Sequence, residues 1–150
     1  MKDFRFWELA LNPSLVAALG AMASSQVFKF IRSILRDGRV DLKRISDYGS
    51  FPSSHSAFAV AGAVAIGINQ GFKSAAFALA VIAAAIFIYD ILRLRPTIAQ
   101  SKRELDRLIE KNGLERLEDA PQFEAHSQTE VIAGIVWGIL CAVLVSLLWP

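Results

Sequence analysis

The chain reads Gly49-Ser50-Phe51-Pro52-Ser53-Ser54-His55-Ser56-Ala57 immediately before an apolar segment that runs from Phe58 to Ile68. Pro52 cannot continue a preceding helix, but it fits just before or at the start of a new one. Ser53 and Ser54 are natural N-caps, and the free N–H groups of such a first turn favour an anion, phosphate above all. His55 adds a group that can move a proton near neutral pH. Taken alone, the stretch fits an ordinary serine-capped helix with a surface histidine equally well, so the rest of the chain has to decide.

The composition indicates a membrane protein. Apolar residues make up 54% of the 150 residues, and the mean hydropathy is +0.42. They are gathered into blocks between charged stretches, which favours a multi-pass membrane protein forming one domain over residues 1–150. The single cysteine, Cys141 in an apolar block, excludes an internal disulfide and a cysteine metal cluster. The net charge of +2 gives no indication of nucleic-acid binding.

The apolar blocks predict an all-α bundle of about four transmembrane helices. These are expected over residues 14–28, 54–68, 74–91 and 131–149. Asn12-Pro13 marks the start of the first helix, and the charged Lys29 and Arg32 are expected to close it. A signal peptide cleaved after Ala21-Met22-Ala23 is an alternative for this segment, but the helical pattern continues past that point.

Two further segments have a predicted role in packing or at the membrane surface. Leucine and isoleucine recur at helical spacing among charges over residues 98–112, which predicts an amphipathic helix lying on the membrane surface or over a site. Gly113 is its expected C-cap. In the last helix, Gly134 and Gly138 form a GxxxG pair, which suits either tight helix packing or a homodimer contact.

The charge distribution predicts how the helices are oriented. With four spans, the segments 32–49 and 93–125 lie on the same side of the membrane, and they hold twelve of the sixteen basic residues. The positive-inside rule therefore places these two segments in the cytoplasm and both termini outside. Some of these arginines could instead serve a substrate.

The same arrangement gathers the unusual polar residues at one membrane face. They are Lys29 at the end of the first helix, Ser53 to His55 at the start of the second, Tyr89, Asp90 and Arg95 at the end of the third, and His126 and Glu130 at the start of the fourth. Ionisable groups that face each other at a membrane boundary are candidates for function. Asp90 is either a helix-end charge in water or a buried partner of Arg93 or Arg95.

Two pairs within this set have spacings that suit chemistry. Lys29 and Arg36 lie seven positions apart, nearly two helical turns, so both can reach one anion. The alternative is a snorkelling lysine and an arginine that only sets topology. His126 and Glu130 are at i and i+4, so the carboxylate could accept from one imidazole nitrogen and leave the other as base or nucleophile. The alternative is structural, because Ser127 to Glu130 also fits a capping box.

Three motifs together resemble the signature of the type 2 phosphatidic acid phosphatase superfamily, which also includes vanadium haloperoxidases. They are Lys29 with Arg36, Pro52 to His55, and His126 with Glu130. Asn12-Pro13, Tyr89-Asp90 and the run His-x-x-x-Glu-Val-x-Ala-Gly from 126 to 134 make the chain more similar to the small divergent membrane branch of that superfamily. The resemblance covers nearly the whole chain.

The resemblance implies cofactor-free, metal-independent hydrolysis of a phosphate monoester or diphosphate on a membrane lipid such as phosphatidylglycerophosphate, phosphatidate or polyprenyl diphosphate. It implies that His126 attacks phosphorus to form a phosphohistidine, that Glu130 orients it, and that His55 protonates the leaving alcohol and later activates water. The implied phosphate-binding residues are Lys29, Arg36, Ser53, Ser54 and Arg95, with Asp90 and Tyr89 in support. The expected location is a bacterial cytoplasmic membrane, and the positive-inside rule puts the active face on the cytoplasmic side.

The chain also departs from the superfamily pattern. Asp37 follows Arg36 where proline is usual, Ser54 replaces a glycine, Glu130 replaces an aspartate, and Ala120 stands where an arginine is expected. These departures favour an alternative function, a non-catalytic lipid-phosphate binder or transporter, although binding alone would not require both histidines. A purely structural protein would leave the polar clustering unexplained, and haloperoxidases are larger soluble proteins.

Overall fold

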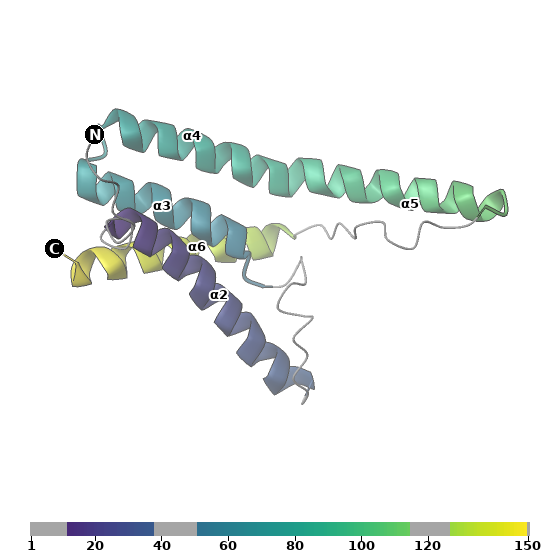
Figure 1. Ribbon diagram of the computed structural model, residues 1–150, viewed down its shortest axis with the longest axis horizontal. Helices are drawn as coiled ribbons and strands as arrows, with labels where there is room; N and C mark the ends of the chain where they lie inside the picture. The colour runs from purple at the N-terminus through teal and green to yellow at the C-terminus, as the bar shows by residue number, and fades with distance from the viewer. Residues whose placement is uncertain (1–11, 38–50, 115–126, 150) are drawn as a thin grey trace, which may run out of the picture.

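The computed structural model describes residues 12–37, 51–114 and 127–149. Four helices form a bundle, and a fifth extends beyond it (Figure 1). The bundle helices are α2 (Pro13–Asp37), α3 (Ser54–Gln70), α4 (Ala75–Tyr89) and α6 (Gln128–Leu148). A π-helical turn, η2 (Asp90–Leu94), joins α4 to the fifth helix, α5 (Arg95–Lys111). The predicted all-α membrane architecture is confirmed.

The core of the bundle is built around α3. Helices α2, α4 and α6 all pack against it, and α2 also contacts α6 (Figure 1). The buried core consists of small side chains: Ala17, Ala21, Ala57, Ala61, Ala65 and Ala142. Because alanine adds little bulk, the helices approach one another closely, as is common in membrane bundles.

The glycine pair of α6 makes the closest approach in this core. Both glycines are buried, and a Cβ on Gly134 would overlap the carbonyl oxygen of Ser53. A Cβ on Gly138 would likewise overlap the carbonyl oxygen of Ala57. Of the two uses expected for this GxxxG pair, tight packing within the chain is the one that the structure shows. A homodimer stays a prediction, and it would have to use another face of α6.

Within the described ranges, three helices are long and apolar enough to cross a membrane: Pro13–Leu35, Ala75–Lys111 and Gln128–Leu148. Helix α3 has 17 residues, which corresponds to a length of about 26 Å at 1.5 Å per residue. It is therefore slightly shorter than a hydrocarbon core of about 30 Å. Its position among the other three helices makes it the enclosed member of the bundle.

The predicted end of the first helix is wrong. Helix α2 does not stop at Phe28 but continues through Lys29 and Arg32 to Asp37. Charged side chains do not interrupt the backbone hydrogen bonds of a helix, and lysine and arginine are good helix formers. Gly38, the next residue in the sequence, belongs to the type that commonly follows a helix end. The basic segment 32–49, which was expected to lie outside the membrane helices, therefore begins inside α2.

The predicted break after the third helix is also wrong. Helix α4, the turn η2 and α5 form one continuous rod from Ala75 to Lys111 (Figure 1). Pro96 lies just after η2, where the N–H of Arg95 donates to the carbonyl of Asp90, five residues back. A proline would clash with the preceding turn of a regular α-helix, and the wider π-helical turn accommodates it. The amphipathic helix is confirmed, but α5 extends away from the bundle. Its C-cap is Asn112, and the expected cap Gly113 is the residue after it, with a positive φ of 63°.

Candidate functional site

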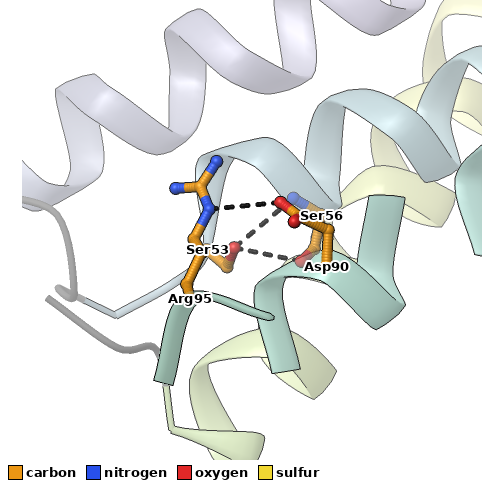
Figure 2. Close-up of polar contacts among 4 residues, drawn as sticks. All are labelled: Ser53, Ser56, Asp90 and Arg95. Carbon is orange, nitrogen blue, oxygen red and sulfur yellow. Dashed lines mark hydrogen bonds and ion pairs between the residues drawn. The ribbon is translucent and has the colours of Figure 1, made fainter. Parts of the chain in front are cut away.

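The start of α3 is buried inside the bundle. Ser53 is its N-cap, and the Ser53 hydroxyl oxygen accepts hydrogen bonds from the N–H and the hydroxyl of Ser56, at 3.4 and 3.0 Å (Figure 2). Ser53 and Ser56 are both 0% exposed. The first turn of this helix therefore faces protein and not open water.

Ser54 is also buried, with 1% of its surface exposed, and its hydroxyl oxygen has no hydrogen-bond partner in the part of the chain that the structure describes. A buried polar group without a partner costs about 1–3 kcal/mol. Such a group in a folded protein asks for an explanation, and a bound ligand is one. An anion oxygen at this helix start would accept the hydrogen bond that the Ser54 hydroxyl can donate.

A backbone hydrogen bond joins the start of α6 to the start of α3. The N–H of Ser53 donates to the backbone carbonyl of Glu130 at 2.9 Å. At the same point, Ser127 and Glu130 form the capping box that the sequence allowed: the N–H of Glu130 donates to the Ser127 hydroxyl at 3.3 Å, and the N–H of Ser127 donates to Oε2 of Glu130 at 3.0 Å. A carboxylate accepts about four hydrogen bonds through its two oxygens, so the Glu130 side chain can accept further hydrogen bonds besides the one in this cap.

His126, the predicted nucleophile, lies outside the described residues. It directly precedes Ser127, the N-cap of α6, in the sequence. The side chain of Arg36 is likewise outside what the structure describes, although its backbone belongs to α2. The predicted roles of these two residues stay predictions.

Lys29 contributes a buried positive charge from α2. Only 8% of its surface is exposed, and the opposite charge that acts on it is that of Glu130 of α6. A lysine buried among apolar helices is costly unless it is paired. Its burial and its attraction to Glu130 do not fit the alternative of a lysine that snorkels to water.

His55 lies among groups from three helices. Its ring packs against Phe87 of α4, with centroids 6.3 Å apart and the rings tilted by 39°. The positive charges of Arg95 from α5 and Lys29 from α2 both act on its imidazole. The structure therefore brings Lys29, His55 and Arg95 together, although they are far apart in the sequence.

Asp90 and Arg95 form an ion pair across the π-helical turn. Nε of Arg95 donates to Oδ2 of Asp90 at 3.4 Å (Figure 2). Residues five positions apart do not face each other on a regular α-helix, where neighbours are three or four apart, so the pairing depends on the wider turn. Of the partners expected for Asp90, Arg95 is the one in the structure. Tyr89 does not join the cluster, because it is 67% exposed.

Two aromatic residues that the sequence did not single out border this cluster. The guanidinium carbon of Arg32 lies 5.4 Å from the centroid of the Phe51 ring, which is a cation–π contact at the entrance to α3. Phe87 packs on His55 from α4. Phe87 has no sequence signal, because an aromatic residue in a membrane helix usually indicates packing. In the described ranges, no three His, Cys, Asp or Glu side chains are grouped so that they could hold a metal ion.

Comparison with known proteins finds a matching family and a relative. Residues 10–141 match the divergent PAP2 family. The membrane protein YuiD of Bacillus subtilis (strain 168), described only as uncharacterized, is 28% identical over 102 residues, which cover 68% of this chain and 65% of the relative. The chain thus spans about two thirds of the length of that relative. No solved structure matches the chain. With its three helices of spanning length, the chain is an integral membrane protein.

Proposed function

Because this chain belongs to the divergent PAP2 family, we propose that it is a metal-independent lipid phosphate phosphatase that works through a phosphohistidine. Its substrate is a phosphate monoester or diphosphate of a membrane lipid. One observation carries the proposal: His55 at the start of α3 packs on Phe87 of α4, within reach of the positive charges of Lys29 of α2 and Arg95 of α5. A histidine beside cations at a helix start suits a phosphate ester, because the cations can hold the phosphoryl group while the imidazole N–H protonates the leaving oxygen.

The phosphate-binding part of the proposal rests on the start of α3. The N–H groups of a helix's first turn and its dipole favour an anion. The buried Ser54 hydroxyl has no described partner to which it donates, and Lys29 adds a positive charge held away from water. Groups that are fixed in place before the substrate arrives stabilise developing charge without reorganising.

The reaction assigns one bond change to each histidine. A nitrogen of His126 attacks phosphorus, the bond from phosphorus to the leaving alcohol breaks, and His55 donates its proton to that alcohol oxygen. Water then attacks the phosphohistidine and gives a proton to His55, which releases phosphate and restores His126. Glu130 lies in the first turn of α6, four positions after His126 in the sequence, and positions the nucleophile through the carboxylate that also completes the capping box.

We place the site on the cytoplasmic face of a bacterial membrane. The segments 32–49 and 93–125 adjoin this face and hold twelve of the sixteen basic residues, and such segments remain in the cytoplasm. Among phosphatidylglycerophosphate, phosphatidate and polyprenyl diphosphate, a cytoplasmic site favours the first.

The test is phosphate release by the detergent-purified protein from these three lipids, with EDTA present. We expect His126→Ala to abolish release and His55→Ala to lower it about 10²–10⁴-fold, the usual contribution of a general acid or base. Lys73→Ala is the control, because Lys73 lies between α3 and α4 at the opposite end of the bundle. Release that survives His126→Ala would mean that another residue is the nucleophile.

One observation favours a second candidate, a lipid-phosphate binder without turnover. Nε of Arg95 donates to Asp90, and Oε2 of Glu130 accepts from the N–H of Ser127, so one expected phosphate-binding group and one expected catalytic group have structural partners. The same assay separates the two functions. A wild-type protein that retains lipid phosphate through purification but releases no phosphate would support the binder.

A further inference from the structure

An apolar groove runs along the bundle between α2, α3 and α4. Its volume is about 270 Å³, and its lining residues include Ala18 of α2, Phe58, Gly62 and Ile66 of α3, and Ala83 and Phe87 of α4. Helices α2 and α4 each pack on α3, and the small side chains between them leave the space open. Apart from Ser14 at one end, every lining residue is apolar.

One end of this groove opens beside the polar cluster. Phe87 lines the groove and also packs against His55, with ring centroids 6.3 Å apart. The other end lies at Ser14, whose hydroxyl accepts a hydrogen bond from the Asn69 side chain at 3.3 Å. The groove therefore begins next to His55 and follows α3 toward the opposite end of the bundle.

The length of the groove matches one leaflet of a bilayer. Phe58 and Ile66 both line it on α3, and eight residues of helix correspond to about 12 Å. One leaflet is half of a hydrocarbon core of about 30 Å. An α-helix with side chains is about 10–12 Å wide, so a volume of about 270 Å³ is too small for one.

We propose that this groove binds one hydrocarbon chain of the lipid whose phosphate lies at the His55 cluster. The inference rests on the proposed function for the position of the phosphate. What it adds is the position of the hydrocarbon chain of the lipid. The apolar lining, the leaflet-like length and the junction with His55 through Phe87 all fit a lipid that enters sideways from the membrane. A saturated acyl chain and a prenyl chain share this chemistry.

Two matched variants test the groove. Ala83 and Ala85 are both exposed alanines of α4, but only Ala83 lines the groove. Ala83→Phe should fill it, whereas Ala85→Phe adds the same side chain elsewhere. As a second pair, Gly62→Leu should also fill the groove, because a Cβ there meets only Ala18 at 3.5 Å. Gly20→Leu is its control, since a Cβ on Gly20 meets nothing within 4 Å.

The readout is photo-crosslinking, which does not depend on turnover. Lipid phosphates with a diazirine in the chain are used, one saturated and one prenyl, and the same chains without phosphate serve as controls. We expect labelling between Phe58 and Ile66 in the wild type and in the two control variants, reduced at least fivefold in Ala83→Phe and Gly62→Leu. The phosphate-free probes should label this segment more weakly, and the better labelled of the two chains identifies the lipid class.

The outcomes separate the groove from the reaction. Equal labelling of this segment in groove-filling and control variants, with all variants eluting as folded protein, would overturn the groove. Labelling that follows the prediction in a wild type that releases no phosphate would keep the groove and reject the phosphatase. If both hold, Ala83→Phe should lower release from the long-chain lipid but not from a short, water-soluble phosphate ester.

Discussion

Helices α3 and α4 begin in the same way but in different surroundings. Each has a serine N-cap, Ser53 or Ser74, whose hydroxyl accepts from the N–H three residues on, at 3.4 and 3.1 Å. Ser53 is fully buried, and its N–H donates to the carbonyl of Glu130, whereas Ser74 is partly exposed beside a turn. The cap explains why a helix starts at each place. Only the burial and the charges around α3 indicate a site.

The first test disrupts the contact that holds the start of α3 in place. Gly134→Ala would push a Cβ into the carbonyl oxygen of Ser53, and overpacking of this kind costs about 1–3 kcal/mol or more. We expect a clear fall in the thermal midpoint in detergent. Gly20→Ala, where a Cβ meets nothing within 4 Å, should leave the midpoint unchanged or raise it. Equal midpoints would show that this contact does not hold the two helices together.

The two caps themselves should differ in what they contribute. Ser74→Ala removes an ordinary cap and should cost about 1 kcal/mol. Ser53→Ala removes a cap and also leaves the buried Ser56 hydroxyl without its acceptor, which adds about 1–3 kcal/mol. Unfolding of both variants in denaturant measures the difference. A smaller loss for Ser53→Ala than for Ser74→Ala would contradict the buried network.

Variants of Glu130 distinguish a structural role of the start of α6 from a catalytic role. Glutamine also forms a capping box, so Glu130→Gln should keep the cap and lose only the attraction to Lys29, whereas Glu130→Ala should lose in addition about one hydrogen bond's worth, 0.5–1.5 kcal/mol. Both remove the charge that attracts Lys29, so phosphate release should fall in both. Full activity in Glu130→Gln would show that Glu130 acts only as a helix cap.

Ser54→Ala should have the smallest effect on folding and a selective effect on binding. Its buried hydroxyl has no partner in the described part of the chain, so removing it should leave stability unchanged or slightly higher. Inorganic phosphate should then protect the variant less against thermal unfolding than it protects the wild type, because a ligand stabilises only the state that binds it. Ser74→Ala should keep the full protection.

The features that could be predicted from the sequence follow local rules. The cap at Ser53, the capping box from Ser127 to Glu130 and the turn at Gly113 each depend on residues within one helical turn. The clustering at one membrane face followed from the alternation of helix direction, and Lys29, His55 and Arg95 do converge there.

The features that could not be predicted depend on the backbone path or on tertiary packing. Charges at Lys29 and Arg32 suggested a helix end, but α2 continues to Asp37 because a charge leaves the hydrogen bonds of a helix intact. The burial of Lys29 depends on how α2 packs on its neighbours. Tyr89 was expected in the cluster from its neighbour Asp90, yet it is largely exposed while Asp90 pairs with Arg95.

The π-helical turn from Asp90 to Leu94 has a consequence for the comparison of related sequences. Such a turn closes hydrogen bonds over five residues instead of four, so it acts as a one-residue insertion in the helix. At 3.6 residues per turn, one residue is a rotation of about 100°. A motif scan that assumes uniform helical spacing across this segment will therefore assign Arg95 to the wrong side of the helix, and an alignment that includes a chain without the turn needs a one-residue gap before Pro96.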